Sequence, residues 1–155
     1  MARISDFSAA EQQHHLDKIR DFPDFGATPW MEGPPLAQRR VAIVATAGLH
    51  LRGDRPFDSG SADYRVIPGD ATDADLVMSH VSVNFDRSGF QEDLNVVFPL
   101  QRLRELAAEG VVGSVADIHY SFMGATQMRA LEGKARELAG LLKKDRVDAV
   151  LLSPV

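Results

Sequence analysis

Apolar residues along this chain occur in two different patterns, and each pattern predicts one kind of secondary structure. Residues 41–46 form a nearly continuous apolar run rich in β-branched side chains, which is typical of a strand buried on both faces. The segments 64–67, 76–81 and 147–152 have the same character. The stretch that follows the first strand, Ala47 to His50, is expected to be a loop at the end of that strand. The pattern therefore predicts strands near these four positions.

In two other segments the apolar residues recur every three or four positions, which predicts amphipathic helices. The first covers residues 99–109, with Pro99 in its opening turn and Gly110 directly after its end. The second covers residues 127–144 and ends in two lysines, which suit the negative end of a helix dipole. A glycine-interrupted apolar segment at 111–118 lies between them and could form another strand. Strands that alternate with helices predict one layered α/β domain over residues 36–155, with a mainly parallel sheet flanked by helices.

Residues 1–35 have a different composition and are expected to form an N-terminal helix followed by an irregular arm. Ser8 is a plausible N-cap for a polar helix over residues 9–20, with Glu11 as its capping-box partner. The stretch 22–35 contains four prolines and two glycines, so it cannot form regular structure. It also carries aromatic residues, which favours packing onto its own domain or a sister subunit over ligand binding.

Composition narrows the class of protein. With 155 residues, 45% of them hydrophobic and 25% charged, the chain has the balance of a globular protein with one core. A formal charge of −5 argues against nucleic acid or an anionic membrane as a partner. No apolar run approaches a membrane span and no signal-peptide pattern opens the chain, so a cytoplasmic protein is expected. The absence of cysteine excludes disulfides, thiolate metal sites and a cysteine nucleophile within this sequence.

Three of the five histidines, namely His50, His80 and His119, lie at or just beyond apolar runs. Loops at strand ends are where α/β folds place functional groups, so these three are candidates, although a single histidine is more often a hydrogen-bonded core residue. His14 and His15 lie in the polar first helix and are expected to be solvated.

The segment 79–86 alternates polar and apolar residues. If it is extended, His80, Ser82, Asn84 and Asp86 share one face, which could be the polar wall of a pocket or the wet face of an edge strand. His50, His80 and Asp86 could in principle hold a divalent cation, but their spacing matches no strong zinc pattern, and no metal site is expected. The sequence also lacks a P-loop, a dinucleotide-binding glycine motif and a nucleophile elbow.

Several segments carry a resemblance that their order makes fairly specific. They are Thr46–His50, Tyr64–Asp70, Leu94–Pro99, Leu103–Leu106, Gly110–Gly113, His119–Gly124 and Val147–Val155. From about residue 36 to its end, the chain resembles selenoprotein B of the glycine/sarcosine/betaine/D-proline reductase family.

The resemblance implies a chemistry that this sequence does not itself contain. In the family, the strand similar to Ala149–Val155 is followed by a selenocysteine or cysteine that cleaves a C–N bond reductively. The resemblance therefore implies a small amino-acid or amine-like substrate, sister reductase subunits and a dithiol donor. A homo-oligomer is also possible. No cofactor is expected within this chain, because the selenocysteine is expected beyond Val155. A selenolate or thiolate there would be favoured at the start of a helix that follows the strand.

The chain also departs from the family. Members with reductase roles are longer, and a chain ending at Val155 looks like a selenoprotein gene read without selenocysteine insertion, so it is expected to be inactive by itself. By position only, His50, His80 and Tyr120 are candidates for supporting the missing nucleophile. Candidates for contacting substrate, again by position, are Asn84, Asp86, Ser121 and Ser153. A non-catalytic subunit that binds substrate or partner stays an alternative, as does a small hydrolase or metal-binding domain.

Overall fold

The structure is a computed structural model whose chain divides into two compact units, Met1–Trp30 and Met31–Val155, each described here by itself. The residues that it describes are 3–20, 22, 24, 26–27, 31–83 and 86–155.

The first unit contains a 3₁₀ turn, η1 (Ile4–Asp6), and helix α1 (Ala9–Arg20). The predicted capping box is present: the Ser8 hydroxyl accepts the Glu11 N–H at 3.4 Å, and the Glu11 carboxylate accepts the Ser8 N–H at 3.0 Å. This confirms the predicted start of the helix. In the arm that follows, Phe25 and Trp30 lie outside the described residues, so its packing stays a prediction.

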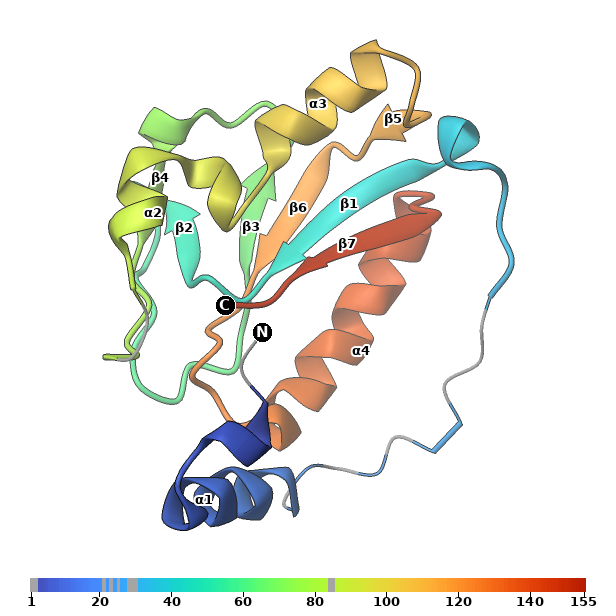
Figure 1. Ribbon diagram of the computed structural model, residues 1–155. Coiled ribbons are helices and arrows are strands. Elements are labelled where there is room, and N and C mark those ends of the chain that lie inside the picture. The colour runs from blue at the N-terminus through green and yellow to red at the C-terminus, as the bar shows by residue number, and fades with distance from the viewer. Residues whose placement is uncertain (1–2, 21, 23, 25, 28–30, 84–85) are drawn as a thin grey trace. The chain divides into compact units, whose positions relative to one another are not determined.

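The second unit is built on a five-stranded sheet (Figure 1). Its central strand β1 (Arg40–Ala45) runs parallel to β5 (Ser114–Val115) and β6 (Ile118–Ser121) along one side and to β7 (Ala149–Ser153) along the other. Strand β3 (Arg65–Pro68) pairs antiparallel with β6. The sheet is thus mainly parallel, and the α/β fold expected from the sequence is confirmed.

One part of the predicted sheet is wrong. The segment predicted at 76–81 forms strand β4 (Leu76–Met78), which pairs antiparallel with β2 (Leu49–Leu51) in a separate two-stranded sheet. The expected loop after β1 therefore contains a strand. The chain turns sharply at Gly48, whose φ of +64° is a conformation that glycine adopts without strain, and this turn takes β2 away from the main sheet.

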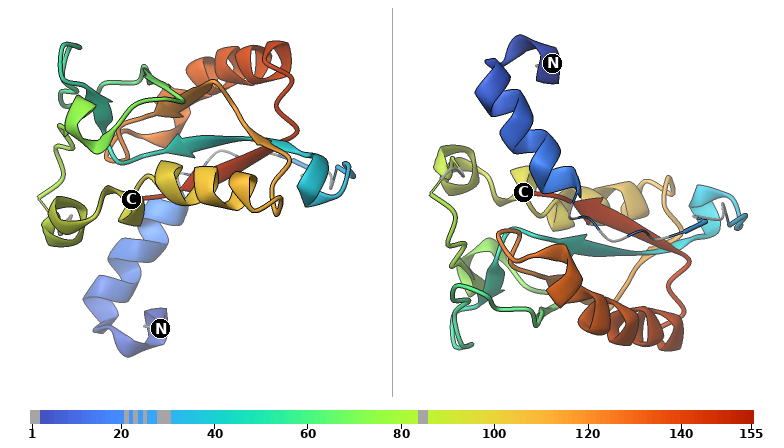
Figure 2. Two further views of the ribbon diagram at one scale, coloured as in Figure 1. Left: turned by 90° about the horizontal axis from the view of Figure 1, so that it is seen from above. Right: turned by 90° about the horizontal axis from the view of Figure 1, so that it is seen from below.

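Two long helices cover opposite faces of the main sheet (Figure 2). Helix α3 (Leu100–Ala108) packs on one face and α4 (Met128–Lys144) on the other, both within one residue of the predicted bounds. Gly110, with φ of +74°, follows the end of α3, as expected for a glycine that terminates a helix. The remaining helical segments are short: η2 (Leu36–Gln38), η3 (Asp73–Asp75), α2 (Ser88–Glu92) and η4 (Leu94–Val96).

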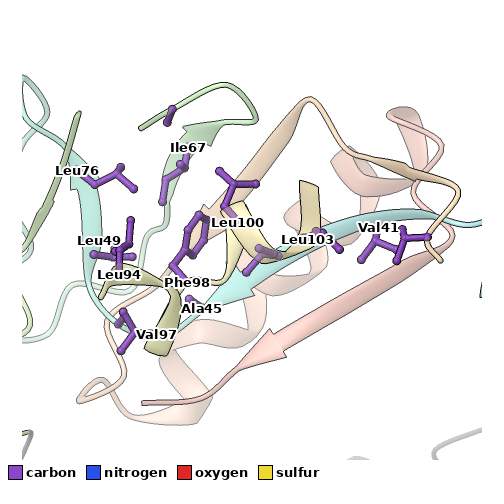
Figure 3. Packing of buried hydrophobic residues seen from close by; sticks show 14 residues of the cluster. Val41, Ala45, Leu49, Ile67, Leu76, Leu94, Val97, Phe98, Leu100 and Leu103 are labelled. Atoms are coloured by element: carbon purple, nitrogen blue, oxygen red, sulfur yellow. The ribbon is translucent and has the colours of Figure 1, made fainter. Parts of the chain in front are cut away.

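The main core lies between the sheet and α3, with Phe98 near its centre (Figure 3). Phe98 is fully buried, and Leu100 and Leu103 of α3 pack with it against Val41 and Ile67. Residues at alternate positions of a strand point to opposite faces, so the other face carries a second, smaller cluster under α4. That cluster consists of Tyr120, Phe122 and Leu138. No helix among the described residues has the length and apolar character needed to cross a membrane.

Candidate functional site

The carboxyl ends of β1, β6 and β7 meet at one edge of the sheet, where open α/β folds place their ligands. Thr46 follows β1 directly and holds the end of the chain in place. Its Oγ1 accepts the Val155 N–H at 2.8 Å and lies 3.3 Å from the Val155 carbonyl oxygen, to which it can donate. The segment after β7 is therefore bound to the end of β1.

Gly124, in the turn after β6, completes this junction. Its N–H donates to the Thr46 carbonyl at 2.8 Å. A Cβ placed on Gly124 would lie 2.5 Å from the Val155 carbonyl oxygen, 2.8 Å from the Thr46 carbonyl oxygen and 3.1 Å from Nε2 of His80. Only a residue without a side chain fits this close approach of three segments. Neither Thr46 nor Gly124 was singled out from the sequence, although a glycine turn directly after an apolar strand is a signal that could have indicated them.

His80 follows β4 and is held against the same junction by a second glycine. A Cβ on Gly48 would lie 3.0 Å from both the N and Cα atoms of His80. The side chain is 5% exposed, and its Nδ1 accepts the Ser82 N–H at 3.2 Å. In the neutral ring the proton is therefore on Nε2, the nitrogen that faces Gly124.

Burial lowers the pKa of His80 from its ordinary value of 6.5, and the nearby Arg87 guanidinium lowers it further. The guanidinium of Arg87 also donates to the carbonyl oxygen of His80, which fixes the backbone at this position. The ring is thus a neutral donor at neutral pH. Such a group can donate a hydrogen bond to an anion beside the carboxyl end of β7.

His119 and Ser121 have bonds that hold the sheet together. Nδ1 of the fully buried His119 accepts the Ile43 N–H at 2.9 Å, within the pair β1–β6. The Ser121 hydroxyl, also fully buried, accepts the Leu49 N–H at 2.9 Å and so attaches the start of β2 to the end of β6. Ser121 lies near the junction, but contact with a substrate stays a prediction for it.

His50 and Tyr120 have contacts within the two sheets. His50 is in β2, opposite Val77, and its Nδ1 is 2.7 Å from the Leu51 carbonyl oxygen. Tyr120 is buried under α4, in edge-to-face contact with Tyr64, and burial raises its pKa. Supporting roles for these two residues stay predictions.

The remaining candidates for contacting substrate are Ser153, Asp86 and Asn84. Ser153, at the end of β7, donates its hydroxyl proton to the Val97 carbonyl at 2.7 Å and points to the α3 side of the sheet. Asp86 is exposed, and its carboxylate accepts the N–H and the hydroxyl of Ser88 at the start of α2, which lowers its pKa. Asn84 lies outside the described residues.

No group of metal-binding side chains accompanies this junction in the described part of the chain. No three histidine, aspartate or glutamate side chains of the described residues are grouped as a metal site would need. Two open hollows, of about 370 and 400 Å³, share Asp70 in their linings. They lie toward the opposite edge of the sheet, where β3 ends and β6 begins.

Comparison with known proteins identifies the family. The model of the glycine/sarcosine/betaine reductase selenoprotein B family matches residues 35–155. The chain belongs to this family. The gamma subunit of D-proline reductase from Acetoanaerobium sticklandii is 39% identical over 121 residues, which are 76% of this chain and 49% of that protein. The gamma subunit of glycine reductase complex component B from Symbiobacterium thermophilum is 31% identical over 140 residues, which are 84% of this chain and 32% of that protein. No solved structure matches significantly.

This chain of the selenoprotein B family spans half or less of the length of these curated relatives. A third relative, the beta subunit of sarcosine reductase complex component B from Peptoclostridium acidaminophilum, is 29% identical over 76% of this chain and 28% of its own length. The family match covers every strand of the main sheet and the whole junction around Val155.

Proposed function

We propose that this chain is part of a reductase that cleaves a C–N bond in a small amino acid or amine, with a selenocysteine or cysteine following Val155 as the reacting group. A dithiol supplies the electrons, and sister subunits complete the complex. The relatives are named as subunits of D-proline, glycine, sarcosine and betaine reductases, which supports this class of substrate.

The observation that supports the proposal most is the geometry around Val155. Its carbonyl lies against Gly124 and Thr46, at the carboxyl edge of the parallel strands, and the Nε2 atom of His80 faces the same point. A nucleophile attached directly after Val155 would start in this corner. The Nε2–H of His80, beside Gly124, would then be a group able to donate a hydrogen bond to a selenolate or thiolate there.

The test is the intact mass of the protein from its native host, grown with selenium. A species heavier than the 155-residue chain that contains selenium, or one that continues with cysteine, supports the proposal. An intact mass equal to that of the 155-residue chain contradicts it and favours a non-catalytic subunit that binds a substrate or a sister subunit.

Activity assays separate the chain from its longer product. The chain as given contains no cysteine and therefore no thiolate. We expect no turnover of glycine, sarcosine, betaine or proline by this chain with a dithiol donor, under conditions in which the longer product in its complex is active. Turnover by the 155-residue chain alone would show that the reacting group is not the one proposed.

A further inference from the structure

Strand β7 combines an apolar sequence with a position at the edge of the sheet. Within the described residues its one partner strand is β1. Val150 is 38% exposed, Leu151 41% and Leu152 69%. Edge strands are usually protected by charged side chains, prolines or bulges, but Ala149–Ser153 contains no charge and no proline. We call the side of β7 that faces away from β1 its outer edge.

The register shows which peptide groups lie along this outer edge. The Ser153 carbonyl accepts the Thr46 N–H at 3.1 Å, so the peptide groups of Ser153 point to β1. Peptide groups of alternate residues in a parallel ladder turn to opposite sides. The N–H and C=O groups of Val150 and Leu152 therefore point outward.

The side chains of the same two residues lie on one face. The Ser153 hydroxyl bonds to Val97, and Ala149 packs against the core that contains α3. Since side chains alternate along a strand, Val150 and Leu152 are on the opposite face, the one that carries α4. Val150 and Leu152 therefore turn their peptide groups to the outer edge and their side chains to the face that carries α4.

We propose that the outer edge of β7 pairs with β7 of a second copy of this chain, antiparallel and centred on Leu151. In this register Val150 of each copy lies opposite Leu152 of the other. Both residues turn their peptide groups outward, so each such pair can exchange both of its N–H···O bonds. The two side chains of a pair lie on the same face and cover each other, which is the unit that stabilises antiparallel strands. The edge is therefore complementary to itself, as a two-fold interface requires.

Charge and size define the strength of this contact. The paired segments Ala149–Ser153 carry no charges, so no like charges meet, and Asp148 of one copy lies opposite the neutral Pro154 of the other. A contact limited to one short strand on each copy is smaller than the about 800 Å² per partner of a standard interface. We therefore infer a weak dimer that dissociates on dilution. This inference stands apart from the proposed reductase activity, because it uses only residues of the described sheet.

The test is sedimentation equilibrium of the chain, from about 10 μM to about 1 mM, the range in which a weak interface becomes occupied. The mass is expected to rise from that of one chain, 17.0 kDa, toward twice that value. Leu152→Lys introduces a charge at the outer edge and should raise the dissociation constant more than tenfold. Val66→Lys is the matched control, because Val66 is 42% exposed on β3 at the other side of the sheet. It should leave the dissociation constant unchanged.

Hydrogen exchange of the unmodified chain gives a second measurement that does not depend on how a variant folds. Protection of the Val150 and Leu152 amides should increase with concentration, while the Leu151 amide, which points to β1, should be protected throughout. A constant mass of one chain overturns the inference. Equal loss of the dimer in both lysine variants also overturns it, as does protection at Val150 and Leu152 that is the same at every concentration, since another part of the same chain would then cover the edge.

Discussion

Nδ1 of His119 accepts the backbone N–H of Ile43 at 2.9 Å, so a side chain takes the place of a backbone carbonyl between β6 and β1. The ring is fully buried and in edge-on contact with Phe98. Burial is the main reason that the pKa of His119 falls from 6.5 to about 4, and Arg104 lowers it further. The folded chain therefore needs the neutral imidazole.

This relationship makes stability depend on pH. Between about pH 4 and 6.5 an unfolded chain binds a proton at His119 that the folded chain does not bind. The free energy of unfolding should rise with pH in this interval, by up to about 3 kcal/mol in total, and level off above it. Urea titrations at a series of pH values measure it. His119→Asn keeps an acceptor near Ile43 and should flatten this dependence, whereas an unchanged dependence would assign it to other groups.

The comparison of two variants separates the hydrogen bond of His119 from its packing. His119→Leu leaves the buried Ile43 N–H without an acceptor and should cost about 1–3 kcal/mol more than His119→Asn at pH 7. The free energies of unfolding from urea titrations measure the difference. If the two variants are equally stable, the bond to Ile43 contributes little to the fold.

Gly124 is expected to tolerate no side chain. A methyl group there would lie 2.5 Å from the Val155 carbonyl and 2.8 Å from the Thr46 carbonyl, and both atoms belong to the backbone. Gly124→Ala should therefore lower the free energy of unfolding by about 1–3 kcal/mol. Gly133→Ala is the matched control, because nothing lies within 4 Å of its Cβ position in α4. It should raise stability by up to about 1 kcal/mol, because alanine favours helix more than glycine does.

Thr46→Val removes the hydroxyl while keeping the shape of the side chain. The Val155 N–H loses its acceptor, and the end of the chain is then held to β1 by fewer bonds. Exchange of the Val155 amide should become faster by about tenfold, as expected for the loss of one hydrogen bond. Thr46→Ser retains the hydroxyl and should exchange at nearly the rate of the unmodified chain. Unchanged exchange in Thr46→Val would mean that this bond is not formed in solution.

Much of the fold follows from local patterns that the sequence displays. The amphipathic repeats predict α3 and α4 to within one residue, and the apolar run after Arg39 predicts β1. The partner of β4 could not be predicted, because it depends on the turn at Gly48 and on the bond from the Leu49 N–H to Ser121, distant in sequence. The antiparallel direction of β3 is likewise set by its pairing with β6. The four residues of β3 do not by themselves indicate this direction.

The candidate site was predicted less completely than the fold, for a related reason. His80 was singled out because it follows an apolar run, and it does lie beside Gly124 and Val155. His50 and His119 satisfied the same criterion, but their rings are held within the sheets by hydrogen bonds to or from the backbone. Position after a strand does not show which way a side chain points. Gly48 and Gly124 shape the junction because they have no side chain, so a pattern of reactive side chains does not indicate them.

The last prediction concerns the tautomer and the pKa of His80. Its Nδ1 accepts the Ser82 N–H, so the neutral ring should carry its proton on Nε2. Because burial disfavours the charged ring and Arg87 adds to this effect, the pKa should lie below 6.5. Nitrogen-15 NMR of the imidazole, followed over pH, reports both properties. Arg87→Gln removes the neighbouring positive charge and should raise the pKa while leaving the tautomer unchanged. A proton on Nδ1, or a pKa above 6.5 in the unmodified chain, would show that His80 is not a neutral Nε2 donor.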